Sequence, residues 1–134
     1  KYETVILPAR KKIFDLYTER FASFPWADLP PGKDAERESS YHLYALRIRE
    51  ISEQQRDEII EELNREEVSV NVHFQPLPLL KLFRESGFSI SDYPVSYNNY
   101  SREISLPIYP QLSDNEVAYV VQAIEKAYNA VCHK

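Results

Sequence analysis

Residues 41–48 read YHLYALRI, and this stretch decides the fold class of the 134-residue chain. Its first half is apolar on both faces, which is typical of a central strand covered by other elements. Ser52 and Gln55 then form the S-x-x-Q pattern of a capping box, which predicts a helix to about Arg65. The predicted core face of this helix consists of Ile59, Ile60 and Leu63. A strand followed by an amphipathic helix indicates a mixed fold.

Further along the chain, residues 68–75 alternate between apolar and polar side chains. The apolar set is Val68, Val70, Val72 and Phe74, and the polar set is Ser69, Asn71, His73 and Gln75. A period of two predicts a second strand, with the first set facing a core and the second a polar surface. Pro76 and Pro78 end this strand because proline cannot donate to a ladder.

The rest of the chain adds four helices and one strand. Apolar spacing predicts a helix over 8–24, stopped by Pro25, and a connecting loop follows to Ser39. Two short helices are expected, one from Leu79 to Gly87 and one from Asp92 to about Arg102, then a strand over 104–108 and a capped helix from 113. This order predicts an α+β fold, a small three-stranded sheet with helices packed on one side.

We expect residues 1–134 to form a single small domain cut from a longer protein. The chain contains no Met, and its only glycines are Gly32 and Gly87, so no glycine-rich phosphate loop is present. Residues 1–25 are expected to be a connecting helix from a missing large domain, and residues 40–134 the α+β core.

Composition argues against several function classes. The net charge is −5 and the basic residues are scattered, so we expect no nucleic-acid partner. The uncharged runs are too short to span a bilayer. The single Cys132 favours a cytoplasmic location without disulfides. Three separated histidines and one cysteine lack zinc-ligand spacing, so no metal site is expected.

His73 is the best single candidate for a functional side chain. It lies on the polar face at the end of the predicted strand, where it could bind an anionic ligand, and Asn71 and Gln75 share that face. The alternative, a histidine that bonds nearby backbone, stays open. Other polar residues have two interpretations as well. The polar-aromatic cluster Asn98–Tyr100 could contact a sugar or simply pack at the surface, and the acidic residues between 58 and 67 are a solvated helix face.

Four blocks of sequence resemble the DegT/DnrJ/EryC1/StrS family of sugar aminotransferases. In order, they are Ser40-Tyr41-His42-Leu43-Tyr44, Val72-His73-Phe74 with Pro76, Asp92-Tyr93-Pro94-Val95, and Ser105-Leu106-Pro107-Ile108-Tyr109-Pro110. The resemblance implies the C-terminal small domain of a pyridoxal-phosphate-dependent transferase of the aspartate aminotransferase type. In such enzymes a lysine in the large domain carries the cofactor, and an amino group passes from an amino donor to a nucleotide-linked keto-sugar.

The resemblance also implies roles for particular residues. His73 and Phe74 match the block that faces the substrate entrance, and Asn71 and Gln75 are weaker candidates for substrate contact. No catalytic residue is expected within the chain, because none of its lysines has a Schiff-base context. The fragment alone is therefore expected to be inactive, the full-length enzyme to be a cytoplasmic homodimer, and the pyridoxal phosphate to be bound mainly by the missing large domain.

Two departures from the family pattern leave other functions open. Pro78 stands where many members have a second histidine, and Glu67 where they often have glycine. A different enzyme of the same cofactor fold is one alternative, for which Arg84 or Arg102 could grip an α-carboxylate. A free-standing α+β binding or interaction module is the other.

Overall fold

The computed structural model describes residues 1–133. A π-helical segment over Tyr2–Ile6 runs directly into the first α-helix. The helices are α1 (Leu7–Phe21), α2 (Glu53–Arg65), α3 (Lys81–Glu85), α4 (Pro94–Tyr100) and α5 (Asp114–Cys132), and the strands are β1 (Ala27–Asp28), β2 (Tyr44–Ile48) and β3 (Glu103–Leu106). Short 3-10 turns at Leu77–Leu79 and Ile90–Asp92 precede α3 and α4.

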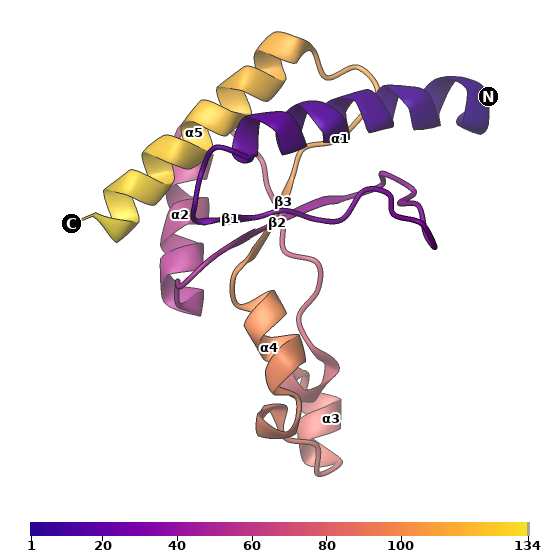
Figure 1. Ribbon diagram of the computed structural model, residues 1–134. Coiled ribbons are helices and arrows are strands. Elements are labelled where there is room, and N and C mark those ends of the chain that lie inside the picture. Colours follow the sequence, from indigo (N-terminus) through magenta and orange to yellow (C-terminus); the bar gives the residue numbers. More distant parts are fainter. Residues whose placement is uncertain (134) are drawn as a thin grey trace.

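The three strands form one antiparallel sheet in the order β1-β2-β3. Tyr44 lies opposite Leu106, and Leu46 opposite Ile104, so these side chains share one face of the sheet. That face is buried, and α1, α2 and α5 supply most of the rest of the core (Figure 1). The predicted α+β class, a small three-stranded sheet with helices on one side, is confirmed.

The predicted strand over residues 68–75 is wrong. Only Asn71 pairs with the sheet, through a single bridge to Ser105 of β3. The two backbone hydrogen bonds of this bridge measure 3.2 and 2.7 Å. Beyond it, the His73 N–H donates to the side chain of Glu103 instead of a strand carbonyl. Phe74, predicted to face the core, is 76% exposed.

The other two predicted strands are present with different ends, and β1 replaces the missing one. Tyr41 has a left-handed backbone (φ +52°), so β2 starts only at Tyr44 instead of residue 41. β3 begins at Glu103 and stops before Pro107, because proline lacks the N–H that a ladder needs. The two residues of β1 lie inside the predicted loop over residues 25–39.

Both predicted capping boxes are present. The hydroxyl of Ser52 accepts a hydrogen bond from the N–H of Gln55, and Ser113 does the same with Glu116 at the start of α5. In contrast, Asp92 does not cap α4. It lies in a 3-10 turn, and Pro94 occupies the first turn of the helix as expected.

An aromatic cluster packs α1 onto the sheet. Phe14 and Tyr17 of α1 contact the ring of Tyr44 with centroid distances of 4.8 and 5.0 Å. The Tyr17 hydroxyl donates to the carbonyl of Pro107 at 2.9 Å. Its burial raises the pKa of this phenol well above the usual range. The helix ends at Phe21, three residues before the predicted end.

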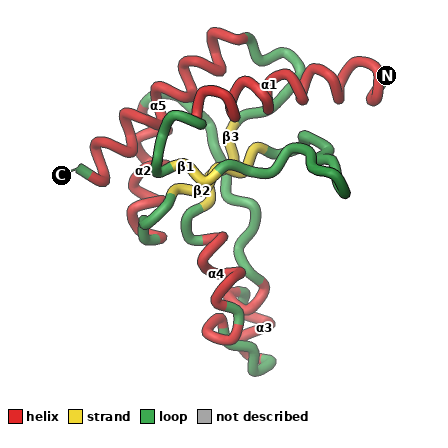
Figure 2. Tube along the Cα trace, in the orientation of Figure 1, coloured by secondary structure: helices red, strands yellow, loops and turns green. Residues whose placement is uncertain are grey.

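The segment from residue 74 to residue 100 projects from the rest of the domain as an arm that carries α3 and α4 (Figures 1 and 2). Most of the exposed large apolar side chains of the described residues belong to it. They are Phe74, Leu77, Leu80, Leu82, Phe88, Tyr93, Val95 and Tyr97. Within residues 1–133, no helix is long and apolar enough to cross a membrane.

Candidate functional site

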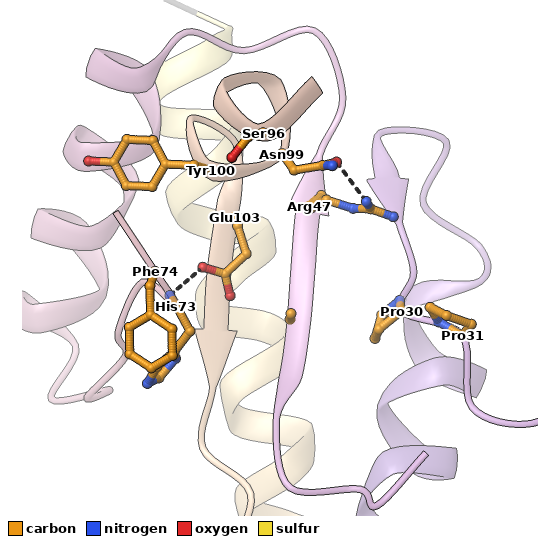
Figure 3. A pocket seen from close by; sticks show the side chains of 10 residues that line it. Pro30, Pro31, Arg47, His73, Phe74, Ser96, Asn99, Tyr100 and Glu103 are labelled. Atoms are coloured by element: carbon orange, nitrogen blue, oxygen red, sulfur yellow. Dashed lines mark hydrogen bonds between the residues drawn. The ribbon is translucent and has the colours of Figure 1, made fainter. Parts of the chain in front are cut away.

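A pocket of about 430 Å³ lies on the face of the sheet that the core helices leave uncovered (Figure 3). Alternation along β2 and β3 places Ala45, Arg47 and Glu103 on this face. The full lining is Pro30, Pro31, Ala45, Arg47, His73, Phe74, Ser96, Asn99, Tyr100 and Glu103. The prolines follow β1, whereas Ser96, Asn99 and Tyr100 come from α4, so segments far apart in the sequence line one pocket.

Arg47 and Glu103 are direct cross-strand neighbours, yet their charged groups turn away from each other. Glu103 is only 4% exposed. One of its carboxylate oxygens accepts the His73 N–H at 2.9 Å, and the other accepts the Ser105 hydroxyl. Burial raises the pKa of this carboxyl group above its usual value, although both hydrogen bonds oppose that shift.

The guanidinium group of Arg47 points away from Glu103, towards α4 and β1. Its Nη1 donates to the side-chain oxygen of Asn99 at 2.8 Å, and its Nε lies 3.2 Å from the carboxylate of Asp28. Arg102 also approaches Asp28, at 4.0 Å. Arg47 therefore links β1, β2 and α4 beside the pocket.

His73 and Phe74 lie at the pocket opposite Arg47 (Figure 3). The two rings meet edge to face with centroids 4.7 Å apart, and the peptide bond between the residues is cis. The Nδ1 atom of His73 is buried and has no hydrogen-bond partner among the described residues. The hydrogen bond that anchors His73 comes from its backbone N–H. Among the described residues, Nδ1 therefore makes no bond to backbone.

The two weaker candidates lie outside the pocket lining. Asn71 forms the bridge to Ser105, and its side-chain oxygen accepts the N–H of Val72 at 2.8 Å. Gln75 is exposed next to Phe74. Asn71 therefore fixes the segment that carries His73 and does not face the cavity itself.

Sequence reasoning missed Arg47 and Glu103 as site residues. A charged residue inside an otherwise apolar strand was the available signal for Arg47. The predicted strand began at residue 104 and so did not include Glu103. The place of Glu103 on the pocket face of the sheet could therefore not be inferred. The cluster at Asn98–Tyr100, considered for sugar contact, does supply Asn99 and Tyr100 to the lining.

The described lysine side chains lie outside this pocket. Five of them make surface ion pairs: Lys11 with Asp15, Lys12 with Asp114, Lys33 with Glu38, Lys81 with Glu85, and Lys126 with Glu66. An amine that attacks a carbonyl group needs a lowered pKa. Hydrogen-bonded carboxylates instead raise the pKa of Lys11, Lys33 and Lys126.

Neither arginine named for the alternative enzyme lines this pocket, and both make hydrogen bonds within the chain. Arg84 donates to the carbonyl of Leu79 at 2.9 Å. Arg102 donates to the carbonyl of Asn98 at 3.0 Å and also approaches Asp28. Within residues 1–133, no group of three or more His, Cys, Asp or Glu side chains is arranged to hold a metal ion.

Comparison with known proteins identifies close relatives of this chain. SpsC of Bacillus subtilis (strain 168), a spore coat polysaccharide biosynthesis protein, is 32% identical over 118 residues, which cover 86% of this chain and 30% of SpsC. MJ1066 of Methanocaldococcus jannaschii is 34% identical over 128 residues, which cover 94% of this chain and 33% of that protein. The chain thus spans about a third of the length of the curated relatives it matches.

Solved structures show the same fold. The apo form of Spr1654 from Streptococcus pneumoniae superposes with a TM-score of 0.93 at 35% identity, over 98% of this chain and 33% of that one. PseC of Helicobacter pylori, at 22% identity and a TM-score of 0.83, supports the fold alone. The model of the DegT/DnrJ/EryC1/StrS aminotransferase family matches residues 4–125. The chain therefore belongs to the DegT/DnrJ/EryC1/StrS aminotransferase family.

Proposed function

We propose that this chain is the C-terminal small domain of a pyridoxal-phosphate-dependent enzyme that transfers an amino group to a nucleotide-linked keto-sugar. The observation that carries the proposal is the family match over residues 4–125, nearly the whole chain. A relative from Aneurinibacillus thermoaerophilus, 28% identical over 117 residues, is named as a dTDP-3-amino-3,6-dideoxy-alpha-D-galactopyranose transaminase. Spr1654 has been solved with the cofactor in its PLP and PMP forms, the two forms between which a transaminase cycles.

In this proposal the domain supplies one wall of the substrate site. The cofactor provides the electron sink for the exchange of the amino group, and residues outside the described chain hold it. His73 and Phe74 contact the substrate. The exposed ring of Phe74 offers an apolar surface to a sugar or base, and the side-chain amide of Asn99 offers a polar group at the same pocket. Asn71 and Gln75 support the segment on either side of them.

We also propose how the domain is joined and assembled. Residues 1–25 act as the connecting helix from a large domain, and residues 40–134 form the core of the small domain. The full-length enzyme works as a homodimer in the cytoplasm, and its partners are a nucleotide-linked sugar and an amino donor. Sedimentation of the full-length protein checks the dimer, which a monomer at micromolar concentration would contradict.

The visible spectrum of the full-length protein tests the activity. We expect bound pyridoxal phosphate to give a yellow protein whose visible band bleaches when a nucleotide-linked amino sugar donates its amine. A colourless protein that cannot be reconstituted with the cofactor would refute the aminotransferase and favour the binding module. Bleaching by amino acids alone, with every amino sugar inert, would favour another enzyme of the same cofactor fold.

Variants of the pocket test the site. Phe74→Ala should raise the KM for the sugar substrate about tenfold, because it removes an exposed aromatic contact surface worth on the order of 1.4 kcal/mol. Phe88→Ala is the matched control, since Phe88 is also an exposed phenylalanine of the arm but does not line the pocket. Equal effects of the two substitutions would place substrate binding elsewhere.

A further inference from the structure

The guanidinium group of Arg47 has unused hydrogen-bond donors at the pocket. A guanidinium group carries five N–H bonds. Among the described residues, those of Arg47 contact two partners, the Asp28 carboxylate through Nε and Asn99 through Nη1. The side chain is 28% exposed and contributes to the pocket lining. Donors on Nη1 and Nη2 therefore remain available to a ligand.

The charge around Arg47 is unbalanced. Asp28 is shared between Arg47 at 3.2 Å and Arg102 at 4.0 Å, so two cations face one carboxylate. The remaining carboxyl group in the pocket lining, that of Glu103, points towards His73 and Ser105 and is largely buried. This side of the pocket therefore carries a net positive charge, which favours an anionic group there.

The guanidinium group is also held in place before any ligand arrives. Asp28 holds one edge and Asn99 holds another, and Pro30 and Pro31 stand beside it (Figure 3). A fixed planar fork loses little side-chain entropy when it binds a carboxylate or phosphate in a bidentate manner.

Two other arginines of the domain show what a purely structural arginine looks like here. Arg56 is 2% exposed, donates to the carbonyls of Tyr100 and Glu103, and lies over the Tyr100 ring. Arg102 donates to the carbonyls of Asn98 and Ile48. Arg47 bonds to no backbone carbonyl among the described residues and faces the cavity.

We propose that Arg47 binds an anionic oxygen group of a ligand, a carboxylate or a phosphate, in the pocket between Pro30-Pro31 and α4. The inference rests on the proposed function, in which the amino donor carries carboxylates and the sugar nucleotide carries phosphates. The shared chemistry is a planar or tetrahedral set of anionic oxygens placed against the guanidinium fork.

A binding measurement on the 134-residue chain tests the inference without cofactor or turnover. The Arg47 Nε–H and Asn99 side-chain NMR signals are followed while 2-oxoglutarate, as the carboxylate, or inorganic pyrophosphate, as the phosphate, is added. We expect a saturable shift of these signals with one of the two ligands. The ligand that causes the shift shows whether the bound group is a carboxylate or a phosphate. No saturable shift with either would overturn the inference.

Substitutions make the test specific to the guanidinium group. Arg47→Gln should weaken binding at least tenfold, whereas Arg49→Gln, an exposed arginine beyond the end of β2 and outside this pocket, should bind as the parent does. Unchanged binding by Arg47→Gln would overturn the inference. If Arg47→Gln does not fold, Arg47→Lys is measured instead, because lysine keeps the positive charge but lacks the planar guanidinium group. Several-fold weaker binding would support the inference, and binding equal to the parent would overturn it.

The two proposals fail in different ways. A full-length protein that transaminates amino sugars while its isolated domain shows no anion binding at Arg47 would keep the function and remove this inference. A colourless full-length protein whose isolated chain still binds the anion at Arg47 would support the anion site and refute the aminotransferase function.

Discussion

At the scale of single residues, the carboxyl group of Glu103 joins the sheet to the segment that carries His73. Both of its oxygens accept hydrogen bonds, from the His73 N–H and from the Ser105 hydroxyl. Burial raises its pKa above the unfolded value of 4.5. The folded state therefore holds this proton more tightly than the unfolded state. The stability that Glu103 contributes is complete below its unfolded pKa and is lost as the pH rises through the folded pKa.

We predict that the free energy of unfolding of Glu103→Gln, relative to that of the parent chain, increases as the pH rises. Glutamine keeps an acceptor for the His73 N–H but removes the cost of a buried charge. Urea denaturation at pH 4 and pH 7 should give a more positive difference in the free energy of unfolding, variant minus parent, at pH 7.

Glu116→Gln is the control, because its stability relative to the parent chain should change with pH in the opposite direction. Hydrogen bonds from the side chain and backbone of Ser113 lower the pKa of Glu116, so its contribution is present above the unfolded pKa and lost as the pH falls. The corresponding difference should be more negative at pH 7 than at pH 3. The same pH trend in both variants would contradict the assignment for Glu103.

The candidate site was predictable only in part, and the reason lies in how each residue reaches the pocket. His73 and Phe74 could be named because local polarity and a sequence resemblance both mark them. Arg47 and Glu103 reach the pocket through the register of β2 with β3, two strands separated by more than fifty residues. A pairing of this kind is set by tertiary packing, which no local pattern in the sequence encodes.

At the scale of elements, Arg56 connects α2 to the base of the arm. Its Nη1 donates to the carbonyl of Tyr100, the last residue of α4, at 2.8 Å, and lies 3.4 Å from the carbonyl of Glu103 at the start of β3. Its Nε contacts Asp57 at 2.6 Å, and the guanidinium carbon lies 4.9 Å from the centroid of the Tyr100 ring. One buried cation thus fixes where α4 ends and where β3 begins.

Arg56→Met is expected to lower the free energy of unfolding by about 2–4 kcal/mol, because it leaves two buried carbonyl groups without their charged donor. Urea denaturation measures the loss, and faster amide exchange in α4 should accompany it. Arg65→Met is the control, since Arg65 makes an exposed ion pair with Glu62, and it should change stability by less than about 1 kcal/mol. Similar losses in the two variants would refute the role of Arg56.

Helices were easier to predict than strands in this chain. Capping boxes at Ser52 and Ser113 and apolar spacing are local signals, and both helices begin where those signals place them. The alternation over 68–75 is a local signal too, but a strand needs a partner along its whole length. Here only Asn71 finds one. β1 consists of two residues and exists because it pairs with the end of β2, so its own sequence carries no signal.

At the scale of the whole molecule, the arm is unusual in how little of it is buried. Its apolar side chains include Leu82 and Val95, which are 71% and 74% exposed. Apolar surface gathered on one projection is typical of a site that contacts another protein surface.

We predict that the isolated chain self-associates through the arm. The double variant Leu82→Ser, Val95→Ser should show a lower average mass than the parent in light scattering at high protein concentration, because less apolar area is exposed. Val5→Ser is the matched control, as Val5 is also an exposed valine but lies in the π-helical segment before α1, outside the arm. If Val5→Ser reduces the mass as much as the double variant, association does not run through the arm.

The attachment of α1 to the sheet has a mechanical consequence. Ile13, Phe14, Tyr17 and Phe21 are all buried, and the Tyr17 hydroxyl ties the helix to the loop after β3. α1 and the sheet therefore form one stiff lever, with the amino-terminal end of the helix at its far tip (Figure 1). A force on the amino-terminal end of α1 would therefore rotate the helix and the sheet together, and the pocket on the sheet would move with them. Because Arg47 and Glu103 are paired across β2 and β3, their separation would stay constant during such a movement.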